Sequence, residues 1–281
     1  MSDSIWLGIF GWPVTHSKSP AMHESAARAL GIALRYERFA VEAGDLADAV
    51  AEKHGAGIDG YNLTVPHKQA IMELIDEVAP GARAIGAVNT VVRTDDGYVG
   101  HNTDAPGFVR SLEEAGVTIQ GARVVVLGAG GAARAGVVGL ADAGASEVIV
   151  LSRRSAQAEE LVASLADRAG TCRLSASTFS DAEHCFDGAS LLVQATSATL
   201  ESNPSAAAFA ASLPIEALPA DATVVDMVYE PRRTTVLARA ELRGLATVGG
   251  VGMLLHQGAI AFEMWTGFQA PLEVMRAALN D

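Results

Sequence analysis

The stretch RVVVLGAGGAARAGVVGLADAGASEVIVLSRR, residues 123–154, decides the fold of this protein. It begins with a run of valines, continues through a glycine-rich turn and a helix-like segment, and ends in a second β-branched run. This order predicts a strand, a tight turn, a helix and a parallel strand, as in a Rossmann-like unit. Gly128, Gly130 and Gly131 stand in the turn, and Ala133 occupies the place of a third fingerprint glycine.

The glycine-rich turn predicts a dinucleotide site. Glycines let the backbone approach a pyrophosphate, and a helix N-terminus offers free N–H groups and the positive end of a dipole. Such a turn can also belong to a plain βαβ unit, but the preceding strand and following helix favour binding. The residues expected to line the site are Gly128, Ala129, Gly130, Gly131 and Ala132.

The end of the second strand indicates which dinucleotide binds. NAD-binding folds place an acidic residue there, which holds the ribose hydroxyls. This chain has Ser152, Arg153 and Arg154 instead. Guanidinium groups bind a 2′-phosphate through charged hydrogen bonds, which an acid would repel. The sequence therefore predicts NADP as the cofactor, although two arginines could also simply lie in solvent at a strand end.

Composition excludes several other functions. The chain has 281 residues and a formal net charge of −13, which argues against non-specific binding to nucleic acid or acidic membranes. Its two cysteines, Cys172 and Cys185, form neither a redox pair nor a zinc framework. The first residues do not read as a signal peptide, and no charge-free apolar run is long enough to span a membrane. We therefore expect a cytoplasmic protein.

The first hundred residues alternate between strand and helix patterns. This alternation predicts an α/β domain with a mostly parallel sheet covered on both faces. Pro106 and Gly107 suggest a division from the nucleotide-binding half. Strands are expected over 5–10, 34–42 and 60–66, helices over 21–31, 43–56 and 67–79, and a hairpin over 87–101. Later strands are expected at SLLVQATS and TVVDMVY, and closing helices over 252–268 and 271–279.

Four polar motifs outside the nucleotide unit follow likely strands, where ligands bind in open α/β sheets. Their hydroxyl, amide, amine and carboxylate groups suit a small polyhydroxylated acid, and no cluster has the spacing of metal ligands. Each has a plainer interpretation: Lys68 as a solvated lysine in a surface helix, Ser19 as an N-cap, Asn89 as a hairpin residue, or Asp104 as a helix cap. The candidate residues are Ser17 and Ser19, Thr64 and Lys68, Asn89, and Asp104.

Taken together, these motifs resemble those of shikimate dehydrogenases over nearly the whole chain. The matching segments are Ser17-Lys18-Ser19-Pro20, NLTVPHK at 62–68, Asn89-Thr90, GHNTDAPG at 100–107, DMVYEP at 226–231 and GVGMLLHQG at 250–258. The resemblance implies two α/β domains with a cleft between them. It implies a discontinuous substrate-binding and catalytic domain, 1–104 plus 251–281, and a Rossmann-type dinucleotide-binding domain, 105–250. It also implies that Tyr229 and Gln257 contact substrate, and that Thr196, Met227 and Gly250 contact NADP.

Two departures from the family pattern stand at the cofactor site. The family's last basic residue after the second nucleotide strand is Gln157 here, so Arg154 is expected to serve in its place. The family's Asn-Ala-Thr-Ser-x-Gly segment is QATSAT, in which Gln194 replaces Asn and Thr199 replaces Gly. A side chain at Thr199 is expected to alter the loop or the nicotinamide pocket.

The resemblance implies reversible reduction of 3-dehydroshikimate to shikimate with NADPH, a step of aromatic amino acid (chorismate) biosynthesis. Hydride transfer makes the ketone oxygen negative, so a proton donor is required. Lys68 is the expected donor because an ammonium both stabilises the developing alkoxide and releases a proton. Asp104 is expected to orient Lys68 and to bind a substrate hydroxyl.

Several alternatives remain open from the sequence. The protein could be a quinate or aminoshikimate dehydrogenase acting on a related ring acid, with NAD as a further choice. It could also be a nucleotide-responsive regulatory protein without turnover, which the paired Lys68 and Asp104 disfavour. The expected partners are the small-molecule substrate and NADP, with no nucleic acid and no membrane, and the expected state is a monomer or homodimer.

Overall fold

The computed structural model describes residues 4–280 and divides the chain into two compact units. The first unit is Met1–Gly107 with Leu255–Asp281, and the second is Phe108–Leu254. The chain passes between the units within α4 (Asp104–Glu114) and again within α10 (Val251–Thr266). These crossings lie close to residues 104 and 250, where the sequence analysis expects the two functional domains to divide.

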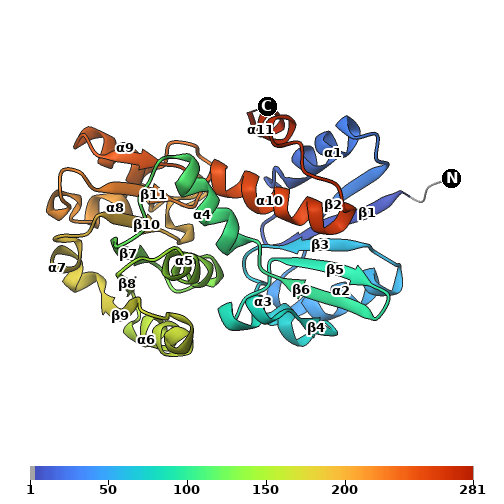
Figure 1. Cartoon of the computed structure of the whole chain (residues 1–281), viewed down its shortest axis with the longest axis horizontal. Coiled ribbons are helices and arrows are strands. Elements are labelled where there is room, and N and C mark those ends of the chain that lie inside the picture. The colour runs from blue at the N-terminus through green and yellow to red at the C-terminus, as the bar shows by residue number, and fades with distance from the viewer. Residues whose placement is uncertain (1–3, 281) are drawn as a thin grey trace. The chain divides into compact units, whose positions relative to one another are not determined.

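The second unit is built on a fully parallel sheet (Figure 1). Among the described residues this sheet has six strands in the order β12-β11-β10-β7-β8-β9, with every pairing parallel. Its strands are β7 (Arg123–Leu127), β8 (Glu147–Ser152), β9 (Arg173–Thr178), β10 (Leu191–Gln194), β11 (Thr223–Asp226) and β12 (Ala246–Val248). Its helices are α5 (Gly131–Asp142), α6 (Ser155–Leu165), α7 (Ala182–Phe186), α8 (Ala206–Ser212) and α9 (Thr235–Leu242), together with most of α4. The expected Rossmann-like sheet is therefore confirmed.

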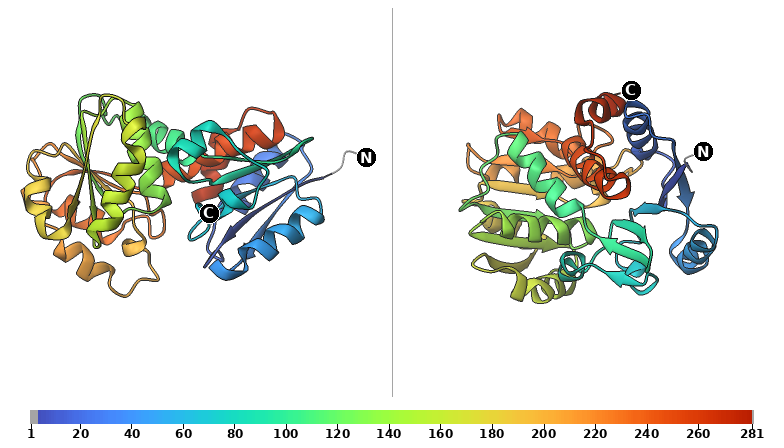
Figure 2. Two further views of the ribbon diagram at one scale, coloured as in Figure 1. Left: turned by 90° about the horizontal axis from the view of Figure 1, so that it is seen from below. Right: turned by 45° about the vertical axis from the view of Figure 1, so that its right-hand side comes forward.

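Helices cover both faces of the second sheet (Figure 2). Val125 and Leu127 of β7 belong to an apolar cluster that also contains Phe186 of α7 and Val236 of α9. Val124 and Val126, which point to the opposite face, are fully buried too. A strand buried on both faces needs continuous apolar residues, which explains the uninterrupted valine run.

The first unit contains a mixed sheet with the order β2-β1-β3-β5-β6-β4 among the residues that the structure describes. The β1–β2, β1–β3 and β4–β6 pairings are parallel, whereas β5 runs antiparallel to both of its neighbours. The strands are β1 (Ile5–Gly11), β2 (Leu34–Ala40), β3 (Gly60–Leu63), β4 (Glu77–Val78), β5 (Thr90–Thr94) and β6 (Gly97–His101). The helices are α1 (Ser19–Ala29), α2 (Leu46–Gly55), α3 (Pro80–Ile85) and α11 (Leu272–Asn280), together with most of α10.

The expected helix over 67–79 is wrong. Only a short 3-10 turn, η2 (Ala70–Glu73), forms there, and Glu77–Val78 is strand β4. Tertiary bonds compete with the helical ladder: the Lys68 carbonyl accepts from Val88 N (2.7 Å), and β4 pairs with β6. The apolar spacing that suggested a helix still buries Ile71, but in a turn and not on a helix face.

The expected hairpin forms as β5 and β6, joined at Asp95–Asp96. The strand at TVVDMVY ends at Asp226, earlier than expected, and its last three residues form the following loop. Gly31 follows the end of α1 with a φ of 70°, as expected for a glycine just beyond a helix. The two closing helices form as α10 and α11.

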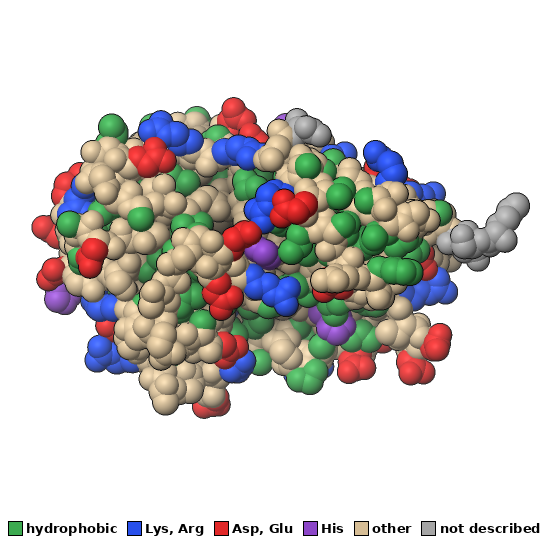
Figure 3. Space-filling model, turned by 45° about the horizontal axis from the view of Figure 1, so that its top comes forward, with side chains coloured by type: hydrophobic (Ala, Val, Ile, Leu, Met, Phe, Trp, Pro, Cys, Tyr) green, Lys and Arg blue, Asp and Glu red, His purple; other side chains and the backbone are tan. Residues whose placement is uncertain are grey.

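No helix within residues 4–280 is both long and apolar enough to cross a membrane. On the face drawn in Figure 3, acidic and basic side chains are interspersed. This mixture accompanies a formal net charge of −13 for the whole chain.

Candidate active site

The four polar motifs of the first unit meet at one edge of its sheet. β1 and β3 run parallel, so the segments that follow them leave at the same edge. β5 is antiparallel to β3 and β6 is antiparallel to β5, so β5 begins and β6 ends at that edge. The register pairs Thr90 with both Asn62 and His101. Residues after β1, β3 and β6 and just before β5 are therefore neighbours.

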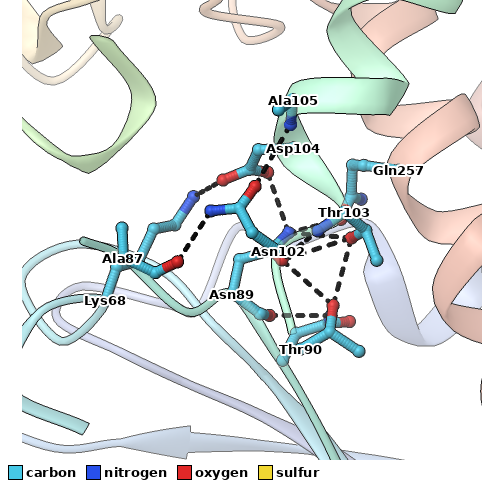
Figure 4. A network of polar contacts seen from close by, with 10 residues as sticks. Lys68, Ala87, Asn89, Thr90, Asn102, Thr103, Asp104, Ala105 and Gln257 are labelled. Atoms are coloured by element: carbon cyan, nitrogen blue, oxygen red, sulfur yellow. Dashed lines mark hydrogen bonds and ion pairs between the residues drawn. The ribbon is translucent and has the colours of Figure 1, made fainter. Parts of the chain in front are cut away.

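Lys68 and Asp104 form an ion pair at this edge (Figure 4). Lys68 Nζ lies 2.5 Å from Asp104 Oδ2, and the two side chains are 16% and 5% exposed. Two plainer interpretations are therefore wrong. Lys68 is not a solvated helix residue. Asp104 does not cap α4, because Asn102 Oδ1 accepts the Ala105 N–H in that role (3.1 Å).

Asn89 fixes the other oxygen of the Asp104 carboxylate. Its Nδ2 donates to Asp104 Oδ1 (2.9 Å) and to Thr103 Oγ1 (2.9 Å), and lies 3.4 Å from Gln257 Oε1. Its Oδ1 accepts the backbone N–H of Thr103 (2.7 Å). Asn89 is 2% exposed, so it is a buried hub of the network and not a hairpin side chain. Asp104 is consequently held in one orientation, by Asn89 on one oxygen and by Lys68 on the other.

A deeper layer supports this hub. Asn62 Nδ2 donates to the Asn89 carbonyl and to Thr90 Oγ1, both at 3.0 Å. The Tyr36 hydroxyl donates to Asn62 Oδ1 (2.7 Å), and burial raises the pKa of Tyr36 well above its usual value, so it stays a neutral donor. Neither Asn62 nor Tyr36 is among the sequence candidates, although Asn62 begins the NLTVPHK motif. A polar residue inside a buried strand was the signal for Asn62.

The loop after β1 presents Ser17 and Ser19 at the same edge. Ser19 is the first residue of α1, and Lys18 precedes it as the N-cap residue, so the interpretation of Ser19 as an N-cap is wrong. Ser17 Oγ accepts the Ser19 N–H at 3.3 Å. Arg38, a residue absent from the sequence candidates, donates from Nε and Nη2 to the Ser17 carbonyl (3.1 and 2.7 Å). It holds the serine loop and adds positive charge beside it.

Thr64 follows β3 and lies against β1. A Cβ on Gly11 would stand 2.2 Å from Thr64 Cγ2, so only glycine fits at the end of β1. The edge therefore combines hydroxyls, amides, an ammonium and a fixed carboxylate, all within the first unit. Within the described part of the chain, no group of His, Cys, Asp or Glu could hold a metal ion. This donor set suits hydrogen bonding to a polyhydroxylated acid and transfer of one proton.

The glycine-rich turn of the second unit has the geometry of a dinucleotide site. Gly128 has a φ of 114°, and a Cβ there would stand 2.7 Å from Thr196 Cγ2. α5 begins directly after Gly130, and no side chain caps it. Its first-turn N–H groups are thus available to a pyrophosphate. Gly130 is exposed, and a Cβ there would meet nothing within 4 Å, which leaves open space for a ligand.

Arg153 and Arg154 follow β8, and both are exposed. Ser152, the last residue of the strand, is buried, and its Oγ accepts the Arg154 N–H at 3.4 Å. Gln157 is also exposed, on the first turn of α6. The end of the strand thus carries guanidinium groups where an NAD site has a carboxylate, and these residues fit a cofactor with a 2′-phosphate.

The remaining candidates divide between the units. Gln257 belongs to the first unit, and Tyr229 belongs to the second. Met227 follows β11, and a Cβ on Gly250 would stand 2.3 Å from its carbonyl oxygen, so Gly250 permits close packing there.

The two departures at Gln194 and Thr199 are not independent changes. Gln194 Nε2 donates to Thr199 Oγ1 at 2.8 Å, and both side chains are buried. In the sequence they stand as separate replacements, because a contact between side chains five residues apart in a loop leaves no periodic signal.

Comparisons with known proteins find related domains along most of the chain. The shikimate dehydrogenase substrate binding domain matches residues 9–91, the shikimate/quinate 5-dehydrogenase family matches 111–210, and the shikimate 5′-dehydrogenase C-terminal domain matches 250–279. The shikimate dehydrogenase (NADP(+)) of Symbiobacterium thermophilum is 43% identical over 277 residues, covering 97% of this chain and 92% of the relative.

Two solved structures are also similar. The shikimate 5-dehydrogenase of Thermus thermophilus, in complex with NADP(H) and shikimate, has a TM-score of 0.84 and 36% identity, and the alignment covers 98% of each chain. The quinate dehydrogenase of Corynebacterium glutamicum, in complex with NAD, has a TM-score of 0.87 and 32% identity, again over 98% of each chain.

Proposed function

This chain belongs to the shikimate dehydrogenase family, and we propose that it uses Lys68 as the proton donor when NADPH reduces 3-dehydroshikimate to shikimate. The observation that carries this proposal is the Lys68–Asp104 pair, fixed beside Asn89 at the ligand-binding edge of the first sheet. The reaction is reversible, and the ketone gains one hydride and one proton in the forward direction.

When bound, NADPH supplies the hydride to the ring carbonyl carbon. The ammonium of Lys68 faces the negative charge that develops on the carbonyl oxygen and donates its proton there. Asp104 holds Nζ in place through Oδ2, while Asn89 fixes Oδ1. The pair is therefore preorganised, so little rearrangement is required when substrate arrives.

Substrate recognition is proposed for residues around this pair. Ser17 and Ser19 present hydroxyls to the carboxylate, in a loop that Arg38 holds. Thr64, Asn89 and Gln257 supply polar groups to the ring hydroxyls, and Tyr229 of the second unit is proposed to complete the substrate contacts. Hydroxyl and amide groups suit a neutral polyol ring, and the nearby guanidinium favours its acidic group.

Cofactor recognition is proposed for the second unit. The backbone from Gly128 to Ala132 would hold the pyrophosphate, and Thr196, Met227 and Gly250 would line the nicotinamide end. Arg153 and Arg154 would bind the 2′-phosphate, with Ser152 beside them. The absence of a carboxylate at the end of β8 supports NADP over NAD, although Gln157 leaves one basic residue fewer than the family pattern.

A second candidate is a quinate dehydrogenase, because a quinate dehydrogenase has a closely similar fold. The arginines after β8 favour the NADP-dependent biosynthetic enzyme. The partly buried Lys68–Asp104 pair argues against a regulatory protein without turnover. A cytoplasmic location and a monomeric or homodimeric state stay predictions.

The test is absorbance of the reduced nicotinamide, with shikimate or quinate and NADP⁺ or NAD⁺ in all four pairings. Fast turnover with shikimate and NADP⁺ alone is the expected result. A preference for quinate or NAD⁺ would overturn the substrate or cofactor assignment and retain the chemistry of Lys68. Binding of NADPH without turnover in any pairing would overturn the proposed reaction.

A further inference from the structure

A second buried polar network lies in the second unit, at the ends of β10 and β11. Gln194 is fully buried, and its Oε1 accepts both the backbone N–H of Thr196 (2.7 Å) and the Thr196 hydroxyl (2.6 Å). This fixes the orientation of its amide, since only the oxygen can accept. Nε2 then donates to the Thr196 carbonyl (2.9 Å), Thr199 Oγ1 (2.8 Å) and Asp226 Oδ1 (3.2 Å).

The Thr199 hydroxyl lies between Gln194 and Asp226. It accepts from Gln194 and hydrogen-bonds the Asp226 carboxylate. Thr199 is 1% exposed, so bulk water could not take the place of its hydroxyl if that group were removed. Gln194 and Asp226 would then each be left with an unsatisfied hydrogen-bonding group. A glycine at this position would have no hydroxyl, and an asparagine at 194 would be one methylene too short to span the same distance. The two residues are matched to each other.

Asp226 connects this pair to two further segments. Oδ1 accepts the Val228 N–H (3.0 Å), and Oδ2 accepts the Thr234 hydroxyl (2.7 Å). Thr234 is the N-cap of α9, and its Oγ1 accepts the Leu237 N–H at 3.3 Å. One fully buried carboxylate therefore joins the loop after β10, the loop after β11 and the start of α9.

The two loops held by this network are those that carry Thr196 and Met227. Thr196 Cγ2 packs against Gly128, the first glycine of the turn, and its Oγ1 also accepts the Ala198 N–H at 3.1 Å. The Met227 N–H donates to the Gln194 carbonyl (2.9 Å), and its Cε packs against Gly136 of α5. A shift of either loop would therefore change the packing against the glycine-rich turn or against the helix that follows it.

We propose that Gln194 and Thr199 act as one hydrogen-bonded pair that positions Thr196 directly, and Met227 through Asp226, for binding of the dinucleotide. They are positioning residues: they do not touch the reacting atoms, and they act through the loops. The inference rests on the dinucleotide site of the proposed function but not on the identity of the ring acid.

The experiment compares Thr199→Val, Gln194→Met and the double variant, with Thr199→Ser as the conservative replacement. NADPH fluorescence titration of each full-length protein measures Kd without any substrate. Each single variant is expected to raise the Kd for NADPH about tenfold, as when a buried hydrogen-bond partner is left unsatisfied. The double variant is expected to resemble one single variant, because the pair acts as a unit. Thr199→Ser retains the hydroxyl and is expected to stay near the wild-type Kd.

The matched control is Thr235→Val, which removes a threonine hydroxyl bonded to the Ala206 carbonyl (3.0 Å) in the same unit but outside the network. Its Kd is expected to be unchanged. Steady-state assays add a second readout: KM for NADPH rises, while kcat at saturating NADPH and KM for shikimate stay near wild type.

Three results would overturn the inference. One is an unchanged Kd in Thr199→Val, even with a lowered melting temperature, since this would show a purely structural role. Another is a fold-increase in the Kd of the double variant that equals the product of the fold-increases in the two single variants. The third is wild-type protein that does not bind NADPH, which overturns the proposed function as well. Wild-type protein that binds NADPH without oxidising shikimate overturns the proposed function alone and leaves the titration as the test.

Discussion

Each unit contains a buried network of similar composition at the carboxyl end of its strands. In the first unit an amide, Asn89, joins the Thr103 hydroxyl to Asp104. In the second unit an amide, Gln194, joins the Thr199 hydroxyl to Asp226. Both aspartates are almost wholly buried, at 4% and 0% exposure. The two networks nevertheless have different expected roles.

The difference is the cation. Asp104 is paired with Lys68, whose side chain remains 16% exposed and can reach a ligand. No described residue pairs a cation with Asp226, and its partners are amide, hydroxyl and backbone groups. A buried carboxylate with a partly exposed ammonium can exchange a proton, whereas one closed by neutral donors can only hold segments together. The same side-chain types thus serve chemistry in one unit and positioning in the other.

The largest expected effect is that of Lys68→Ala. Loss of the proton donor should lower kcat by roughly 10²–10⁴-fold, the usual range for general acid catalysis. NADPH binding should be unchanged, because the network of the second unit is intact. Steady-state kinetics and fluorescence titration measure both quantities. Lys53→Ala on α2 is the control. Full turnover by Lys68→Ala would show that Lys68 is not the proton donor, so the first network would have no role in the chemistry.

Exchanging each aspartate for asparagine tests the comparison directly. Asp104→Asn keeps the size of the side chain but loses the charge that orients Lys68, so kcat should fall about 10²-fold. Asp226→Asn should leave kcat at saturating NADPH within a few-fold and should raise the Kd for NADPH instead. If the two variants lower kcat equally, then the networks do not differ in the way proposed.

Replacing Arg153 and Arg154 by alanine tests whether the second unit recognises the 2′-phosphate of NADPH. The loss of charged hydrogen bonds to the 2′-phosphate should raise KM for NADPH by roughly 10- to 100-fold. KM for NADH should change little, since that cofactor has no such phosphate. KM for shikimate should also be unaffected. A parallel rise for NADPH and NADH would contradict the assignment of these arginines.

The smallest expected effect concerns stability against pH. Burial raises the pKa of Asp226 above its usual 3.8, although hydrogen bonds from Thr234, Val228, Thr199 and Gln194 lower it in part. As pH rises, the Asp226 carboxyl therefore loses its proton at a lower pH in the unfolded chain than in the folded protein. The contribution of Asp226 to stability is full below 3.8 and falls as pH rises through the raised value.

Asp226→Asn does not titrate at this position and should lack that fall. The difference in free energy of unfolding between Asp226→Asn and wild type should therefore change in favour of the variant as pH rises from 3.8. Urea unfolding at a series of pH values measures it. A difference that stays constant with pH would show that the Asp226 carboxyl has no raised pKa in the folded protein.

Much of the fold could be predicted because its signals are local. The valine run at 124–126 and the glycines after it specify a buried strand and a tight turn within a few residues. The segment 67–79 could not be predicted in this way. Its apolar spacing is helical, but the Val88 N–H takes the Lys68 carbonyl, and β6 pairs with Glu77–Val78. Long-range bonds of this kind decide short segments and leave no mark in the local pattern.

For the same reason, only some residues of the site could be predicted from the sequence. Lys68, Asn89 and Asp104 follow or precede strands, so topology alone brings them together. Arg38 lies within a strand that reads as an ordinary alternating one, and its bonds to the Ser17 carbonyl depend on a fold that brings two distant segments together. The Gln194–Thr199 contact depends on loop geometry, which the sequence pattern does not encode.

The division of the chain also implies an order in which the two units can fold during synthesis on the ribosome. The first unit includes both Met1–Gly107 and Leu255–Asp281, whereas the second unit is one continuous stretch. Trp265 Nε1 donates to the Val91 carbonyl (2.9 Å), and α11 packs on α1. We therefore expect that the second unit can fold as soon as its residues have emerged, whereas the first unit is completed only when α10 and α11 have been made. Until then it exposes apolar surface, and this interval is when the nascent chain most needs protection from aggregation.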